Sequence, residues 1–224
     1  MALGPITTVL FDWGHTLFDT AGSIEFVAAR SAALGHPVPE ALARRLHAEA
    51  LRRSRTSEEL AKGRDKSLAV HRECWLALWE PFDRECPGLA AELWTFETSA
   101  AGWSPFVDVP DVLAALREAG TRVAVVSDVP FDLRPIFDHY DLGHLVEDYF
   151  LSGEHRALKA ERELFRIALA SLSVEPGECL MVGDNNANDG FAVTEGIRTL
   201  LLPMVPSGQP RGLEAVLRLA VTDH

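Results

Sequence analysis

Three carboxylates, a hydroxyl and an ammonium group stand shortly after short apolar runs of this sequence: Asp12, Asp184, Asp189, Ser127 and Lys159. If these runs are parallel strands, their carboxyl ends meet at one edge of a sheet, which is where open α/β sheets bind ligands. Three carboxylates gathered there repel one another unless a cation lies between them. Mg²⁺ prefers oxygen ligands and binds through one or two carboxylates together with a substrate phosphate. The residue types therefore predict a magnesium site that binds the phosphate of a small molecule.

Each of these residues has an ordinary structural interpretation when it is taken alone. Asp12 or Asp184 could cap a helix, Ser127 could belong to a turn, and Lys159 could be a surface charge. Their joint placement after strand-like runs favours a functional site. Lysine is also scarce, because Lys62, Lys66 and Lys159 are the only three in the chain.

The elements that must position these side chains are five apolar runs that are continuous rather than alternating. They span residues 6–11, 122–126, 148–151, 179–182 and 198–202. Continuous runs are typical of strands that helices cover on both faces. Amphipathic helical patterns separate the runs from residue 105 onward. This alternation predicts an α/β fold with a doubly wound, Rossmann-like parallel sheet.

Residues 20–102 break the alternation, because they contain apolar stripes at helical spacing and no strand pattern. The stripes begin near Ile24, Leu42, His71 and Leu89. They predict a helical cap inserted into a core that consists of residues 1–19 and 103–224. The charged stretch at residues 52–66 is predicted to be a solvated helix and its loop.

Composition excludes several classes of protein. The chain has 224 residues with 21 basic and 33 acidic side chains, a formal charge of −12. This charge argues against binding to nucleic acid or an anionic membrane, and leaves a small molecule as the expected partner. Apolar runs are far shorter than the ~20 residues of a membrane span, and the start lacks a secretory pattern, so a cytoplasmic protein is expected. Cys74, Cys86 and Cys179 are expected to be plain thiols.

The first 17 residues and residues 105–205 resemble the haloacid dehalogenase superfamily, whose phosphatases share four ordered motifs. Asp12 matches the nucleophile of that family, Ser127 its hydroxyl, Lys159 its lysine, and Asp184 with Asp189 its acidic pair. The resemblance implies that Asp12 attacks phosphorus and forms an aspartyl phosphate. Mg²⁺ and Lys159 would neutralise the charge of the transferring group, while Ser127 donates a hydrogen bond to it.

The resemblance also implies a set of metal ligands and supporting residues. The expected ligands are Asp12, Asp184 and the backbone carbonyl of Gly14. Asp189 is expected to orient a metal-bound water or Lys159 from behind the ligands. Asp128, which follows Ser127, is expected to support the site without a defined role.

The sequence departs from the family pattern at Gly14. Most phosphatases of the family have a second aspartate there, which protonates the leaving oxygen and then activates water. General acid–base help of this kind is worth about 10²–10⁴ in rate. One interpretation is a phosphatase whose leaving group needs little protonation, such as an acyl phosphate, or whose proton comes from His15, which replaces a glycine of the motif.

Two other interpretations are open. Phosphonoacetaldehyde hydrolases of the same superfamily also lack the second acid and form an imine on a cap lysine, a role for which Lys62 and Lys66 lie in the right part of the chain. The third interpretation is a weakly active or inactive member of the superfamily that serves as a binding or regulatory protein. A halide-removing enzyme fits less well, because it needs no metal, and Asp184 and Asp189 would then be superfluous.

Overall fold

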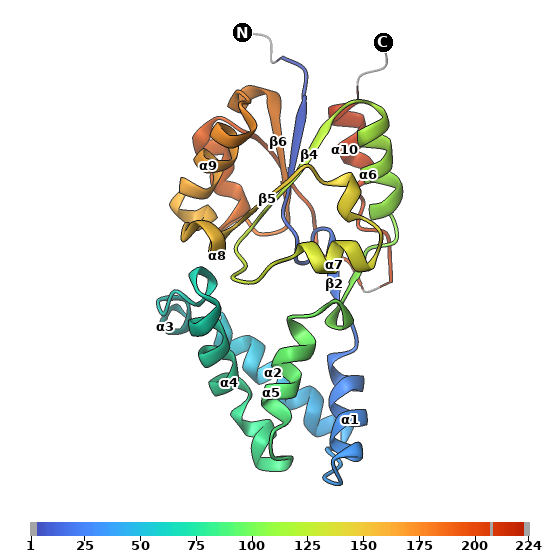
Figure 1. Ribbon diagram of the computed structural model, residues 1–224, viewed down its shortest axis with the longest axis vertical. Helices are drawn as coiled ribbons and strands as arrows, with labels where there is room; N and C mark the ends of the chain where they lie inside the picture. The colour runs from blue at the N-terminus through green and yellow to red at the C-terminus, as the bar shows by residue number, and fades with distance from the viewer. Residues whose placement is uncertain (1–3, 207, 222–224) are drawn as a thin grey trace.

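The computed structural model of the protein describes residues 4–206 and 208–221 (Figure 1). Its main sheet has five parallel strands in the order β5-β4-β1-β6-β7. The strands are β1 Thr8–Phe11, β4 Arg122–Ser127, β5 Asp148–Leu151, β6 Cys179–Gly183 and β7 Arg198–Leu201. The predicted parallel sheet is confirmed, and every strand ends within one residue of the end of its predicted run.

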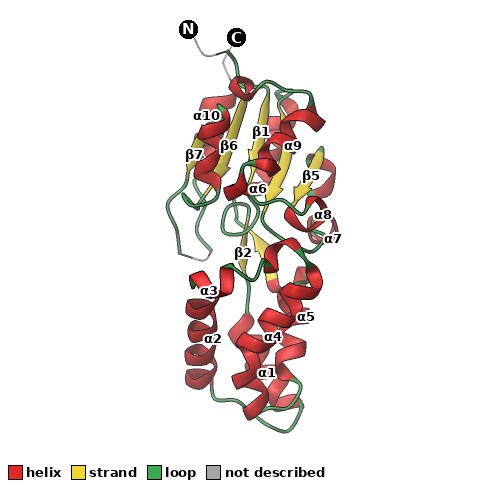
Figure 2. Ribbon diagram, turned by 90° about the vertical axis from the view of Figure 1, so that its left-hand side faces the viewer, coloured by secondary structure: helices red, strands yellow, loops and turns green. Residues whose placement is uncertain are grey.

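Helices cover both faces of this sheet (Figures 1 and 2). One face packs against α6 Val109–Glu118, α7 Arg134–His139 and α10 Glu214–Ala220, and the other against α9 Glu163–Leu172. Val9 and Phe11 of β1 belong to the first core, whereas Leu10 between them belongs to the second. Since successive strand residues point to opposite faces, a sheet covered twice needs apolar residues at every position. This explains the continuous runs in the sequence.

The segment predicted to be a cap folds into helices beyond the carboxyl ends of the strands (Figure 2). These are α1 Ser23–Ala33, α2 Glu40–Ser54, α3 Ser57–Leu60, α4 Leu68–Glu85 and α5 Leu89–Glu97. They share a separate apolar core that includes Val27, Leu78, Phe82 and Leu93. The helices expected from the four stripes are confirmed, and the treatment of residues 20–102 as a separate domain stays a prediction.

One part of the helical segment differs from the expectation. Residues 52–66 were expected to face solvent, yet Glu59 and Arg64 are each only 8% exposed. Arg64 lies over the ring of Trp75 and donates a hydrogen bond to the carbonyl of Ser54 at 2.6 Å. The expectation that these two side chains are exposed was therefore wrong, because each has partners that allow its burial.

Two short strands join the helical segment to the sheet. β2 Phe18–Thr20 pairs antiparallel with β3 Trp103–Pro105, so the chain leaves and re-enters the core along one ribbon. The Tyr140 hydroxyl donates to the carbonyl of Trp103 at 2.5 Å and anchors this ribbon to α7 and the residues after it. Nothing in the local sequence predicts these three-residue strands.

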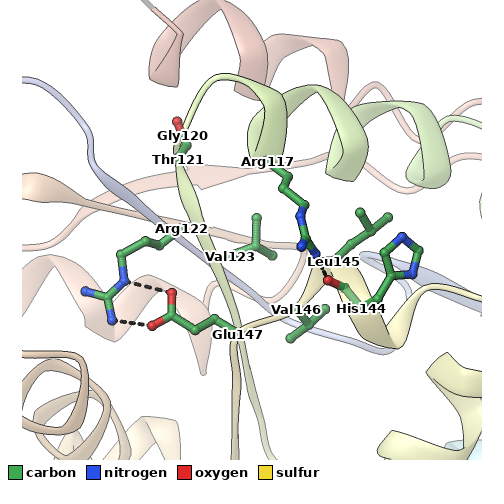
Figure 3. Close-up of a pocket in the computed structure, with 9 residues that line it drawn as sticks. All are labelled: Arg117, Gly120, Thr121, Arg122, Val123, His144, Leu145, Val146 and Glu147. Atoms are coloured by element: carbon green, nitrogen blue, oxygen red, sulfur yellow. Dashed lines mark hydrogen bonds and ion pairs between the residues drawn. The ribbon is translucent and has the colours of Figure 1, made fainter.

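Short 3₁₀ turns and one small helix complete the chain. They are η1 Arg64–Lys66, η2 Ala100–Gly102, η3 Gly143–Leu145, α8 Ser152–His155, η4 Lys159–Glu161, η5 Pro176–Glu178 and η6 Asp189–Glu195. None of the helices within the described part of the chain is long and apolar enough to span a bilayer. A depression of about 380 Å³ lies at the amino end of β4, beside the ion pair of Arg122 and Glu147 (Figure 3). Its lining contains none of the predicted site residues.

Candidate active site

The carboxyl ends of the neighbouring strands β1 and β4 and the start of η4 bring Asp12, Ser127 and Lys159 together. Asp12 follows β1 and is only 7% exposed, while Ser127 is the last residue of the neighbouring strand β4. The hydroxyl of Ser127 donates to Asp12 Oδ1 at 3.0 Å, and Nζ of Lys159 donates to the same oxygen at 2.6 Å. The structure thus joins three residues that lie up to 147 positions apart in the sequence.

Asp189 fixes both the lysine and the loop that follows β6. It is fully buried, and its Oδ1 accepts a hydrogen bond from Lys159 Nζ at 2.5 Å. Its Oδ2 accepts the backbone N–H groups of Asp184 at 3.0 Å and Asn185 at 2.9 Å. A Cβ at Gly183 would stand 2.1 Å from that Oδ2, so only glycine allows the loop to fold back this closely. Both oxygens of Asp189 are therefore engaged within the protein.

Asp128 supports Lys159 through its backbone, whereas Asp12 and Asp189 bind its ammonium group. Its Oδ1 accepts the backbone N–H of Lys159 at 2.9 Å, which places the start of η4 against the loop after β4. Lys159 itself is only 2% exposed. Burial alone would lower the pKa of Lys159, but Asp12, Asp189 and Asp128 outweigh it and raise that pKa above its ordinary value. The lysine is therefore a fixed positive charge.

Three carboxylates lie close enough together to share a cation. One oxygen each of Asp12, Asp184 and Asp189 lies within 4.8 Å of the other two. Burial raises the pKa of Asp12 to about 7, Asp189 and Asp184 add to this effect, and Lys159 opposes it. Burial and Asp189 likewise raise the pKa of Asp184. Carboxylate oxygens that repel one another in a buried place are the donor set that a divalent cation such as Mg²⁺ satisfies.

The turn after Asp12 shapes the remaining side of this cluster. The hydroxyl of Thr16, which is fully buried, reaches Asp12 Oδ2 at 3.5 Å and Asp184 Oδ1 at 3.4 Å. The N–H of His15 donates to the carbonyl of Phe18 at 2.6 Å. Because N–H and C=O of a trans peptide point in opposite directions, the Gly14 carbonyl faces away from Phe18. The structure records no hydrogen bond to this carbonyl from the described residues, so it is available as a ligand.

Positions 14 and 15 differ from the family pattern in their surroundings as well. A Cβ at Gly14 would meet the ring of Trp103 at 3.7 Å, an ordinary contact distance, so an indole borders the place of the missing acid. His15 has a φ of 58°, in the left-handed region that favours glycine. Its Nδ1 lies 3.4 Å from Asp19 Oδ1, and its side chain is 35% exposed.

Sequence reasoning missed one buried residue beside this turn, Arg211. Its side chain is 1% exposed, and its Nε donates to the carbonyl of His15 at 2.6 Å. Arg211 lies between Pro210 and Gly212 in a segment rich in turn-forming residues. Such a composition is typical of a surface loop, so the local pattern gives no signal for this burial.

The two lysines of the helical segment are held in ion pairs. Nζ of Lys62 lies 2.6 Å from Glu59 Oε1, and the pKa of Lys62 is raised, chiefly by this hydrogen bond. Nζ of Lys66 lies 2.5 Å from Glu161 Oε1 in η4, so this pair connects the helical segment to the core. An imine-forming lysine has to lose its proton, and the Glu59 pair opposes this at Lys62.

Solved structures of similar fold come from several hydrolases. HAD-hydrolase YfnB from Bacillus subtilis bound to magnesium gives a TM-score of 0.73 at 17% identity and covers 98% of this chain and 100% of that one. A HAD phosphatase from Thermococcus onnurineus gives a TM-score of 0.66 at 21% identity, and the match covers 96% of this chain and 98% of that one. L-2-haloacid dehalogenase from Xanthobacter autotrophicus gives a TM-score of 0.67 at 21% identity, and the match covers 90% of this chain and 79% of that one. At these identities the likeness establishes the fold.

Sequence comparison identifies the family. An uncharacterised hydrolase of Schizosaccharomyces pombe is 25% identical over 136 residues, which make up 57% of this chain and 59% of that protein. The chain therefore spans about 59% of the length of this curated relative. The sequence profile of the haloacid dehalogenase-like hydrolases matches residues 6–192, which include every carboxylate of the cluster. The chain belongs to the haloacid dehalogenase-like hydrolases.

Proposed function

We propose that this hydrolase is a Mg²⁺-dependent phosphatase of a small phosphorylated metabolite, with Asp12 as the nucleophile. The observation that carries the proposal is the buried Asp12 carboxylate, hydrogen-bonded to Ser127 at 3.0 Å and Lys159 at 2.6 Å beside two further carboxylates. Asp12, Asp184 and the Gly14 carbonyl would hold the cation. Mg²⁺ held there would lower the pKa of Asp12 from its value of about 7 and would offset the charge of the phosphoryl group.

The residues of the chain have separate tasks in the proposed reaction. An oxygen of Asp12 attacks phosphorus, the bond from phosphorus to the leaving oxygen breaks, and an aspartyl phosphate forms. Ser127 and Lys159 already donate to Asp12 and are placed to donate to the phosphoryl oxygens that arrive next to it. Water then attacks phosphorus, which releases inorganic phosphate and restores the carboxylate. Asp189 holds the lysine in place throughout with its Oδ1, while its Oδ2 holds the loop of Asp184.

The surroundings of Gly14 favour a leaving group that departs without a proton. Glycine carries no acid, and the neighbouring ring of Trp103 offers carbon atoms at 3.7 Å from the place of a Cβ. Acyl or aryl phosphates suit such a site, because their leaving oxygens are weakly basic. His15 is the donor that the turn offers for more basic leaving groups, and Asp19 at 3.4 Å would orient its ring.

The acidic cluster also bears on the other candidate activities. A halide-removing enzyme needs no cation, and Asp12, Asp184 and Asp189 would then repel one another without a function. Carbon–phosphorus cleavage through an imine would require Lys62 or Lys66 to leave an acidic partner. The phosphatase is therefore the activity that the geometry supports best.

The test compares leaving groups of different basicity. Phosphate release with Mg²⁺ should be fast from acetyl phosphate, slower from p-nitrophenyl phosphate and slowest from an alkyl phosphate. Asp12→Asn should abolish release, while Asp141→Asn, which changes a fully exposed carboxylate, should not. Equal activity of the Asp12 variant would overturn the proposal. His15→Ala with an unaltered pH–rate profile would remove His15 as donor, and borohydride trapping with phosphonoacetaldehyde would expose an imine.

A further inference from the structure

Arg211 is a buried cation whose partners are backbone carbonyls. Its Nε donates to the carbonyl of His15 at 2.6 Å, its Nη2 to the carbonyl of Leu202 at 3.3 Å, and its Nη1 to the carbonyl of Pro203. The guanidinium also lies over the ring of Phe106, 5.6 Å from its centroid. Five donors in a rigid plane suit a residue that must hold several carbonyls at once.

The backbone around Arg211 is held as firmly as its side chain. Asp108 Oδ1 accepts the N–H of Arg211 at 2.8 Å. Its Oδ2 accepts the N–H groups of Gly212 at 2.8 Å and Leu213 at 2.9 Å. Gly212 has a φ of 88°, which a glycine adopts without cost. One carboxylate thus captures three successive amides and directs the guanidinium into the protein.

One carbonyl that Arg211 binds lies in the turn that carries Asp12 and Gly14, and the other two lie in the segment after β7, which is hydrogen-bonded to the loop of Asp184. His15 lies in the turn after Asp12, directly beside Gly14. Leu202 follows β7, and its N–H donates to the carbonyl of Gly183 at 2.8 Å, immediately before Asp184. A continuous set of hydrogen bonds therefore runs from the turn at His15 through Arg211 and Leu202 to the loop at Asp184.

Arg211 also contributes charge to the cluster. Burial lowers the pKa of Arg211, and the negative charges of Asp184, Asp108 and Asp19 partly offset this effect. The same side chain thus connects the turn after Asp12 to the segment after β7 and places a positive charge in the surroundings of the acidic cluster.

We propose that Arg211 is a positioning residue of the cation site, which sets the separation between the Gly14 carbonyl and the carboxylate of Asp184. This inference rests on the proposed function, because it assigns both groups to the metal. Supporting partners of metal ligands typically change metal affinity about 10–100-fold when they are removed. A residue that served folding alone would change stability and leave the affinity of the folded fraction unaltered.

The experiment measures the binding of Mn²⁺, followed by electron paramagnetic resonance of the free ion, to the metal-free full chain. Arg211→Met should weaken Mn²⁺ binding about 10-fold or more. Arg211→Lys should also weaken it, because the single nitrogen of an ammonium group keeps the charge but cannot reproduce the planar fork whose three nitrogens bind the three carbonyls. Arg218→Gln is the control, since the Arg218 side chain is 76% exposed in the same terminal region. The Mg²⁺ concentration for half-maximal hydrolysis should rise in the Arg211 variants, with a smaller effect on kcat at saturation.

The outcomes separate the inference from the function. If the parent binds Mn²⁺ and releases phosphate while folded Arg211 variants bind Mn²⁺ as tightly, the inference alone is overturned. If Arg211→Met does not fold, Arg211→Lys decides the question by the same comparison. If the parent itself binds no Mn²⁺, the proposed function fails and the role of Arg211 falls with it.

Discussion

Replacing Asp12 by asparagine should stabilise the metal-free protein above neutral pH, although it removes the proposed nucleophile. Asparagine keeps the shape of a protonated aspartate and an oxygen for Ser127 and Lys159. The pKa of Asp12 is about 7 in the folded chain against 3.8 in the unfolded one. At about 1.4 kcal/mol for each pKa unit, the ionised carboxylate then costs the folded state about 4 kcal/mol.

The pH dependence follows from the sign of this difference. Below 3.8 the carboxyl is protonated in both states and costs nothing; the cost grows as the pH rises and is complete above about 7. Urea denaturation in EDTA should therefore show a gain for Asp12→Asn of about 4 kcal/mol at about pH 8 and of less than about 1 kcal/mol at about pH 4. Asp141→Asn should show no gain at either pH, because that side chain is fully exposed.

Magnesium provides the second half of this test. Mg²⁺ should stabilise the parent at about pH 8 and have little effect on Asp12→Asn, because the ion binds the native carboxylates. An asparagine variant that is less stable than the parent in EDTA at that pH would refute the reasoning. So would a difference in stability that stays constant between the two pH values, since a constant difference does not come from ionisation.

Three further substitutions test other parts of the site. Lys159→Met should lower the free energy of unfolding by about 3–5 kcal/mol in urea denaturation, because two buried carboxylates lose their partner; an unchanged midpoint would contradict this. Gly14→Asp should raise the hydrolysis of alkyl phosphates relative to acetyl phosphate by up to about 10²-fold, and an equal gain in Gly14→Asn would exclude proton donation as its cause. His15→Gly should raise thermal stability by about 1 kcal/mol by relieving the positive φ, and a lower melting temperature would show that the Asp19 contact outweighs that strain.

The parallel sheet could be predicted from the sequence because its signals are local. Each strand lies in a mainly apolar run, and a polar residue marks the end of some of these runs, as Asp12 does for β1 and Ser127 for β4. The end of a parallel strand also fixes the edge of the sheet at which the residue directly after that strand lies. For this reason the sequence positions of Asp12, Ser127 and Lys159 predict that these side chains lie close together, and their hydrogen bonds confirm it.

The ribbon of β2 and β3 and the burial of Arg211 could not be predicted in this way. β2 pairs with residues more than 80 positions further along the chain, and three residues are too few to show a period. Arg211 is buried because the chain folds back so that its guanidinium binds the carbonyl of His15, 196 positions earlier, together with that of Leu202, and its neighbours in the sequence do not indicate this. Likewise, Glu59 and Arg64 look like solvated charges in sequence, and their partners are seen only in the folded chain.

The pairing of Thr20 with Trp103 has a consequence for how such a protein can vary. The two points where the helical segment is attached lie opposite each other in an antiparallel ribbon, only about 5 Å apart. A segment attached in this way can be lengthened, shortened or exchanged for an unrelated one without shifting any strand of the main sheet. The α/β core with its acidic cluster and the helical segment can thus diverge at different speeds, with the ribbon as the boundary between them.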